Sequence, residues 1–289
     1  MADEQLMEAR FSASVLDRRS VGAVLVKRSF WPTFFSRVAA RLQWSATAID
    51  LAPDARAWPD LPAERRDRLT TLLAGFCVAE EAVSEHLAPY GSAAKDASMA
   101  SEESLMAWCF FLQRRDEVRH ALLFDRIAAE VLQLPGDAPG ERRAAAREYA
   151  PAAVLELFEE RLPALAGELA EGRTGLCEGV SLYHMVLEGV IFDAGQRALL
   201  EDLADDALPG IREGITRVEK DERWHIGFGL RCLIESRPSQ QHVDNLVARA
   251  AEAASAWGDA VPPLIQERVA RMCAHRLHVA GLRETQAAA

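Results

Sequence analysis

Two copies of the pattern Glu-x-x-His constrain this chain more than any other feature. The first copy holds Glu117 and His120, and the second holds Glu222 and His225. Apolar residues recur around each copy in steps of three and four, so both copies are predicted to face the interior of a helical protein. Because an unpaired buried carboxylate costs several kcal/mol, something must neutralise these acids.

Two further glutamates occupy apolar helical stripes. Glu80 continues the series of Leu73 and Phe76, and Glu188 stands inside the apolar run at 186–192. Glu81 points about a quarter turn away from the stripe and is the weaker candidate. The predicted inward set, in chain order, is Glu80, Glu117, His120, Glu188, Glu222 and His225.

Four carboxylates and two imidazoles on four helices form the ligand set of a ferritin-like dinuclear metal site. Four negative charges balance two divalent ions, and the mixture of oxygen and imidazole ligands suits iron or manganese. One alternative stays open. In it, His120 and His225 are ordinary core histidines, and the acids pair with arginines such as Arg119 and Arg223.

The rest of the chain is typical of an all-α fold. No run of alternating β-branched residues occurs, and we predict one ferritin-like domain over residues 1–289, with a four-helix bundle core and additional flanking helices. Its predicted parts are an N-terminal arm (1–62), a metal-binding bundle (63–235) and additional helices (236–289). The predicted helices cover about 63–87, 102–134, 151–171, 176–203, 209–235, 240–257 and 261–280.

Charge and cysteine usage exclude several classes of function. The net charge of −11 disfavours nucleic acid as a partner. The five cysteines form no Cys-x-x-Cys pair and lie mostly in apolar helical context, which favours reduced thiols. No apolar run approaches about 18 residues and no hydrophobic signal core is present, so we expect a cytoplasmic protein without membrane insertion.

Four segments resemble one known family. Residues 76–83, 116–120, 183–189 and 221–225 are similar to the small subunit of class I ribonucleotide reductase. They most closely resemble its relatives, the ligand-binding oxidases with a mixed manganese/iron site. This resemblance covers about residues 40–235, and it implies O2 as a co-substrate, a long-chain fatty acid or other hydrophobic small molecule as a ligand, and a homodimer.

The resemblance also implies roles for individual residues. Glu80, Glu117 and His120 would hold manganese, whereas Glu188, Glu222 and His225 would hold iron, with Glu117 and also Glu222 as candidate bridges. A di-iron pairing stays open. Asp221 would orient His120 and contact Trp44, as carboxylates beside metal-bound imidazoles commonly do.

Val83 and Tyr183 match the pair that these oxidases join by an ether cross-link, although Tyr183 could instead be an ordinary core residue. In a regular α-helix, Tyr183 would lie about 140° around the axis from Glu188. We therefore predict a π-type turn between them, because such turns favour functional sites. His184 is then a core histidine or, as in the related arylamine N-oxygenases, an extra metal ligand.

The leading hypothesis is an O2-activating oxidase. A di-iron N-oxygenase or desaturase-like enzyme is a second reading, and a metal or lipid binding protein without turnover is a third. A ribonucleotide reductase radical generator is disfavoured, because Phe124 stands where those proteins have the radical tyrosine and no tyrosine follows Tyr183.

Overall fold

The structure is a computed structural model that describes residues 31–96 and 102–283. These residues form helices joined by turns and loops, and no strand occurs among them, so the all-α prediction is confirmed. Residues 1–30 of the predicted arm and 284–289 of the predicted additional helices lie outside the described part of the chain. Among the described residues, no helix is both long and apolar enough to cross a lipid bilayer.

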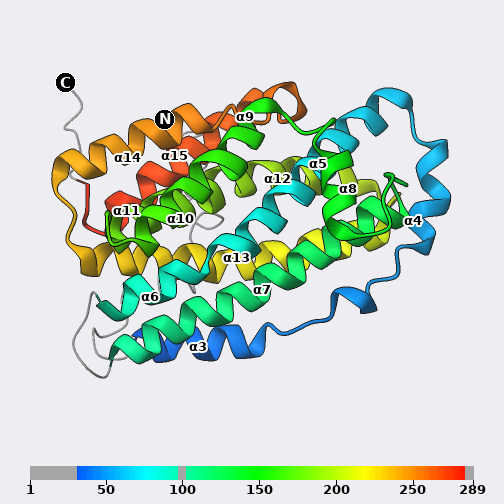
Figure 1. Cartoon of the computed structure of the whole chain (residues 1–289). Coiled ribbons are helices and arrows are strands. Elements are labelled where there is room, and N and C mark those ends of the chain that lie inside the picture. The colour runs from blue at the N-terminus through cyan, green and yellow to red at the C-terminus, as the bar shows by residue number, and fades with distance from the viewer. Residues whose placement is uncertain (1–30, 97–101, 284–289) are drawn as a thin grey trace.

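Four long helical runs form the centre of the molecule (Figure 1). They follow the predicted boundaries closely, except that the second ends at Glu130 instead of near Leu134. In the third run a π-helical segment interrupts the α-helix. The runs are α5 (Ala63–His86), α7 (Glu102–Glu130), the succession α11 (Leu176–Val180), η4 (Ser181–Phe192) and α12 (Asp193–Asp202), and α13 (Pro209–Ser236).

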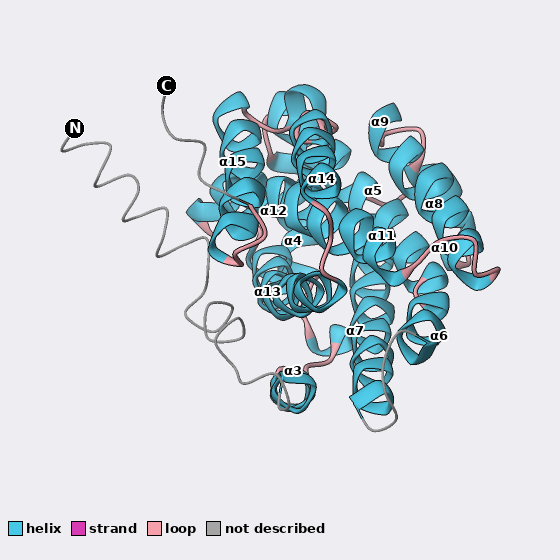
Figure 2. Ribbon diagram, turned by 90° about the vertical axis from the view of Figure 1, so that its left-hand side faces the viewer, coloured by secondary structure: helices cyan, strands magenta, loops and turns pink. Residues whose placement is uncertain are grey.

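Shorter helices surround these four runs. Figure 2 shows α14 and α15 on one side of the bundle and α8 and α10 on the other. The helix predicted at 151–171 contains a π-helical stretch at its centre. The surrounding elements are α3 (Trp31–Arg41), α4 (Ala52–Ala57), α6 (Ala88–Asp96), α8 (Pro139–Ala146), α9 (Ala152–Leu155), η3 (Glu156–Arg161), α10 (Leu162–Ala170), α14 (Gln240–Ala253) and α15 (Pro263–Val279).

Four of these helices, α3, α4, α6 and α8, were not predicted. Helices α4, α6 and α8 each have a proline in their first two positions: Pro53 in α4, Pro89 in α6 and Pro139 in α8. Proline is tolerated there because the first N–H groups of a helix have no partner inside the helix.

The arm fixes the N-terminal end of α13. The Asp54 carboxylate, completely buried, accepts hydrogen bonds from the backbone N–H groups of Gly210 and Ile211 at 2.9 and 2.8 Å. These are two of the N–H groups that a helix leaves unpaired at its start. A Cβ atom at Gly210 would lie 2.2 Å from the carbonyl oxygen of Asp50, so only glycine fits this approach.

The predicted π-type turn is confirmed and is longer than expected, since π-helix spans all of η4. The C-terminal part of the chain contributes hydrogen bonds to it. Arg276 of α15 donates to the carbonyl oxygen of Gly189 at 2.7 Å, and Trp257, in the turn between α14 and α15, donates to that of Ile191 at 2.8 Å. Helix α15 and this turn therefore help to hold the irregular segment that carries Tyr183 and Glu188.

Candidate metal centre

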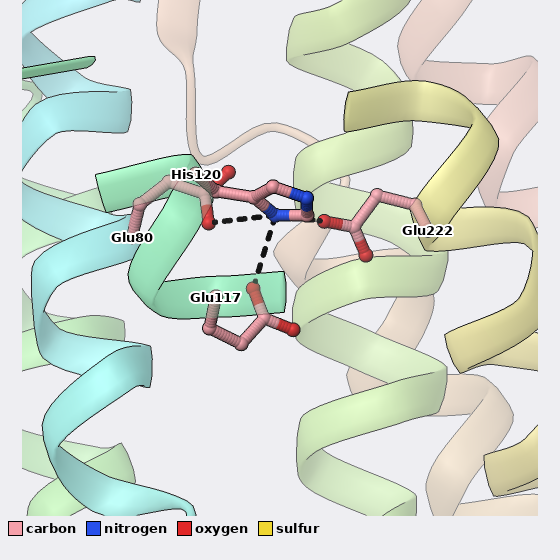
Figure 3. A group of neighbouring side chains, drawn as sticks. All are labelled: Glu80, Glu117, His120 and Glu222. Carbon is pink, nitrogen blue, oxygen red and sulfur yellow. Dashed lines mark ion pairs between the residues drawn. The ribbon is translucent and has the colours of Figure 1, made fainter. Parts of the chain in front are cut away.

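The six predicted inward residues meet at one place in the bundle. Their ligand atoms form two groups, and within each group all the atoms lie within 4.8 Å of one another. Glu117 and Glu222 belong to both groups, as the sequence analysis expected of bridging residues. The first group is Glu80, Glu117, His120 and Glu222, drawn in Figure 3, and the second is Glu117, Glu188, Glu222 and His225.

Both imidazoles direct Nδ1 toward the carboxylates. The Nδ1 atom of His120 lies 3.2 Å from Glu117, 3.5 Å from Glu222 and 3.6 Å from Glu80. The Nδ1 atom of His225 lies 3.1 Å from Glu117, 3.2 Å from Glu188 and 3.3 Å from Glu222. Each imidazole therefore faces three carboxylates from three different helical runs.

Several carboxylate oxygens in the cluster have no hydrogen-bond partner, although none of the four glutamates is more than 3% exposed. Both oxygens of Glu80 are unpartnered, as is one oxygen of each of Glu117, Glu188 and Glu222. Buried polar groups without partners are rare in folded proteins and call for a specific explanation. Two divalent cations would provide one, and the residues present fit such a pair in number, charge and donor type.

The protonation of the cluster is strongly perturbed. Burial raises the pKa of Glu80 and of Glu222 to about 8 and that of Glu188 to about 7. Burial also acts to raise the pKa of Glu117, but His225 and His120 lower it well below its usual range. Without metal, then, Glu80 and Glu222 hold protons near neutral pH, and Glu188 is partly protonated.

Two aspartates lie beside the Nε2 atoms of His120 and His225, the ring nitrogens that do not face the glutamates. Asp221 Oδ2 lies 3.1 Å from Nε2 of His120 and accepts a 2.8 Å hydrogen bond from Nε1 of Trp44. Both contacts were implied by the resemblance to the ligand-binding oxidases. Carboxylates placed in this way orient metal-binding imidazoles and increase their basicity.

The corresponding role of Asp116 was missed. Its Oδ2 atom lies 3.5 Å from Nε2 of His225 and accepts a hydrogen bond from Nε1 of Trp224 at 3.1 Å. Arg119 donates to both aspartates, at 2.7 Å each. The signal was in the sequence, because both Glu-x-x-His units are preceded directly by aspartate.

Tyr183 faces the cluster. Its hydroxyl donates to Glu117 Oε1 at 2.7 Å and accepts a hydrogen bond from Gln113 Nε2 at 3.2 Å. Gln113 also binds Glu188, at 2.8 Å, and His184, at 3.1 Å. Gln113 was not among the predicted functional residues.

The remaining candidates lie around this cluster. His184 belongs to neither ligand group, and burial lowers its pKa well below the usual value, so the ring is neutral. Val83 is completely buried on α5, about one turn after Glu80. Glu81 is half-buried, lies 4.0 Å from Arg143 and is outside both groups.

The arginines of the alternative interpretation have other acidic partners. Arg119 pairs with Asp116 and Asp221, and Arg223 pairs with Glu219 on its own helix. In the described structure, the ion pairs of the four glutamates run to His120 and His225. Neutralisation of the cluster by these two arginines is therefore not supported.

The bundle and its ligand groups define a ferritin-like helical protein with a buried carboxylate and histidine cluster. No known protein-family model matches the chain. Solved structures of R2-like ligand-binding oxidase are similar to it, with a TM-score of 0.70 and coverage of 86% of this chain. The similarity establishes the fold and confirms the predicted fold class.

Three of these structures illustrate the range. A mutant with an aerobically reconstituted Mn/Fe cofactor is 18% identical, with 92% of its chain covered. A long-soak structure with a Mn/Fe cofactor is 19% identical, with 91% covered. Another mutant, with an Fe/Fe cofactor, is 18% identical, with 92% covered. The structural neighbours are thus oxidases with dinuclear metal cofactors.

Proposed function

We propose that this protein is an O2-dependent oxidoreductase with a dinuclear centre of manganese and iron, with di-iron as the second pairing. The observation that carries the proposal is the pair of overlapping ligand groups with unpartnered, buried carboxylate oxygens. The Mn/Fe and Fe/Fe cofactors of the structural neighbours support the choice of metals.

The proposed ligands divide between the two groups. Glu80, Glu117 and His120 would hold the first ion, and Glu188, Glu222 and His225 the second. Glu117 would bridge them, as would Glu222, because both belong to both groups. His184 is assigned as a core histidine, which favours the oxidase over the N-oxygenase alternative.

When bound, the two ions would supply the redox chemistry toward O2. The protein's own residues provide the setting. Tyr183 donates a hydrogen bond to Glu117 at 2.7 Å, so a proton acceptor is in place if this hydroxyl loses its hydrogen. The six ligands and Tyr183 are almost completely buried, which keeps bulk water away from an oxidising centre.

The finer proposal is an ether bond between the Tyr183 oxygen and Val83. Its formation removes the phenol hydrogen and one C–H hydrogen of Val83, with O2 as the oxidant. The resemblance to ligand-binding oxidases supports this bond, as it supports a long-chain fatty acid or similar hydrophobic molecule as the ligand. The complete burial of Val83 and Tyr183 is compatible with the bond.

The test is to load the protein with Mn(II) and Fe(II) without oxygen and then admit air. We expect O2 consumption and a mass loss of two hydrogens in the peptide pair that contains Val83 and Tyr183. Tyr183→Phe should abolish the mass loss and retain metal binding, whereas the exposed-site control Tyr149→Phe should change neither. Metal binding without O2 consumption would leave a binding protein without turnover.

We also propose that the protein forms a homodimer through an exposed apolar stripe on α7. Antiparallel packing of two such helices about a twofold axis near residue 115 would place Trp108 opposite Leu122 and Phe111 opposite Val118. The aromatic residues at the N-terminal end of one stripe would then contact the aliphatic residues at the C-terminal end of the other copy's stripe. Such pairing makes the stripe complementary to itself, as a twofold interface requires. The stripe consists of Leu105, Trp108, Phe111, Val118 and Leu122, which are 38–53% exposed.

A further inference from the structure

Gln113 connects three residues around the cluster and is itself completely buried. Its amide nitrogen donates to Glu188 Oε1 at 2.8 Å and to the Tyr183 oxygen at 3.2 Å. Its amide oxygen lies 3.1 Å from Nε2 of His184. One side chain therefore separates His184 from a cluster carboxylate.

The chemistry of these partners fixes the orientation of the amide. The Tyr183 hydroxyl uses its single hydrogen in the bond to Glu117, so it can only accept from Gln113, and the NH2 group of Gln113 must face Tyr183 and Glu188. The amide oxygen must then face His184, and it too can only accept. The Nε2 atom of His184 therefore carries the hydrogen of this bond.

The position of this hydrogen determines which nitrogen of His184 can bind a metal ion. A neutral imidazole has one protonated nitrogen and one nitrogen with a free lone pair, and only the latter can bind a metal. With Nε2 protonated, the lone pair of His184 is on Nδ1, which has no hydrogen-bond partner. The nitrogen that faces Gln113, the side chain that also binds Glu188, is thus unable to act as a ligand.

The position of the ring is also fixed by packing. A Cβ atom at Gly229 would lie 2.1 Å from Cγ of His184, so the ring fills the space that this glycine leaves. The rings of Tyr183, Phe110 and Phe228 meet it at centroid distances of 4.6, 5.9 and 5.9 Å. These contacts leave Nε2 beside the one polar side chain, Gln113, that binds it.

We propose that Gln113 determines the ligand number of the centre, by holding His184 in the Nε2-protonated form and so excluding it as a third histidine ligand. This inference rests on the proposed dinuclear function. Gln113 is a positioning residue in this scheme, since it acts through Glu188 and His184. Loss of the amide would free Nε2 of His184 for a metal ion.

The first test uses the unaltered metal-free protein. With 15N-labelled histidine, NMR should show His184 as a neutral ring protonated at Nε2. A His184 ring protonated at Nδ1 would overturn the proposal. Since no metal is involved, this result is independent of the proposed function.

The second test replaces the amide. Gln113→Met keeps the length of the side chain and removes both hydrogen-bonding groups. In protein loaded with Mn and Fe, X-ray absorption should then show one additional imidazole ligand. The double variant Gln113→Met, His184→Phe should return to the original number, because phenylalanine fits the aromatic surroundings but cannot bind metal.

The matched control is Gln196→Met, which removes another buried amide, from α12. It should leave the number of imidazole ligands unchanged. The same imidazole count in Gln113→Met as in the original protein would overturn the proposal, as would a change that persists in the double variant. Failure of the original protein to bind two metal ions would instead refute the proposed function.

Discussion

Asp221 of α13 lies 3.1 Å from Nε2 of His120, a residue of α7. The reverse arrangement also occurs, since Asp116 of α7 lies 3.5 Å from Nε2 of His225 on α13. Each helix thus supplies the acid that orients the histidine of the other helix. Arg119 bridges the two acids and balances part of their charge.

Replacing either aspartate should weaken metal binding without removing a ligand. An asparagine cannot stabilise the imidazole with a negative charge, so Asp221→Asn should reduce affinity at the His120 side by about 10–100-fold. Asp116→Asn should do the same at the His225 side. Competition with a chelator of known affinity measures both effects.

The exposed replacement Asp67→Asn on α5 is the control and should leave the affinity unchanged. If Asp221→Asn bound both ions as tightly as the original protein, the orienting role of the carboxylate would be refuted.

Periodicity predicted the buried cluster of glutamates and histidines because the cost of burying acids makes them conspicuous. Glu80 and Glu188 each interrupt an apolar stripe. Because a buried carboxylate must be neutralised, both were predicted to join the same inward cluster. The π-helix was predictable for a similar reason, since Tyr183 and Glu188 could share a face only if the helix widened between them.

Polar residues whose partners are distant in sequence were harder to predict. Gln113 stands on an apolar stripe like the glutamates, but an amide needs no countercharge, so nothing indicated a function. Asp54 accepts hydrogen bonds from the start of a helix that begins 155 residues later, at Pro209. No local sequence pattern predicts such a contact. The hydrogen bond of Arg276 to Gly189 of η4 likewise depends on tertiary packing alone.

The capping role of Asp54 gives a stability prediction. Asp54→Ala removes both hydrogen bonds to the N-terminal end of α13 and should lower the free energy of unfolding by about 1–2 kcal/mol. Urea denaturation followed by circular dichroism measures this change. Asp54→Asn, which keeps one acceptor oxygen, should lose less, and the exposed control Asp67→Ala should lose almost nothing. Equal stability of Asp54→Ala and the original protein would contradict the cap.

Metal binding should depend on pH. The pKa of Glu188 is raised to about 7, and those of Glu80 and Glu222 to about 8, because burial disfavours their charged forms. Below these values metal ions must displace protons, so apparent affinity should rise as pH increases toward about 8. Isothermal titration calorimetry in buffers of different ionisation enthalpy would measure the protons released.

The raised pKa values of these glutamates also affect the stability of the metal-free protein. A carboxyl whose pKa is raised by folding stabilises the folded state below its unfolded pKa of about 4.3. That contribution is lost as pH rises through about 7 to 8. The difference in melting temperature between metal-loaded and metal-free protein should therefore grow from about pH 6 to about pH 8. A difference that stays constant would show that these carboxyls do not hold the expected protons.

The apolar stripe on α7 predicts the oligomeric state. Phe111→Glu places a carboxylate opposite Val118 of the second copy, about one turn from the proposed twofold axis. It should convert the dimer to a monomer, because the carboxylate would lose its hydration on association. Sedimentation equilibrium measures the molecular mass. Leu264→Glu, at an apolar residue that is 66% exposed on α15, is the control and should remain dimeric. A monomeric original protein would refute the proposed interface.

Alanine at Gly229 should destabilise the protein, whereas alanine at another helical glycine, Gly167, should stabilise it. In Gly229→Ala the new methyl group would meet the His184 ring, which is held by three aromatic neighbours and cannot retreat freely. Overpacking of this kind costs about 1–3 kcal/mol. Gly167→Ala on α10 has no atom within 4 Å of the new Cβ and should stabilise the helix by up to about 1 kcal/mol. Thermal denaturation of the metal-free variants measures both changes, and a Gly229→Ala protein as stable as the original would mean that the ring of His184 is free to move.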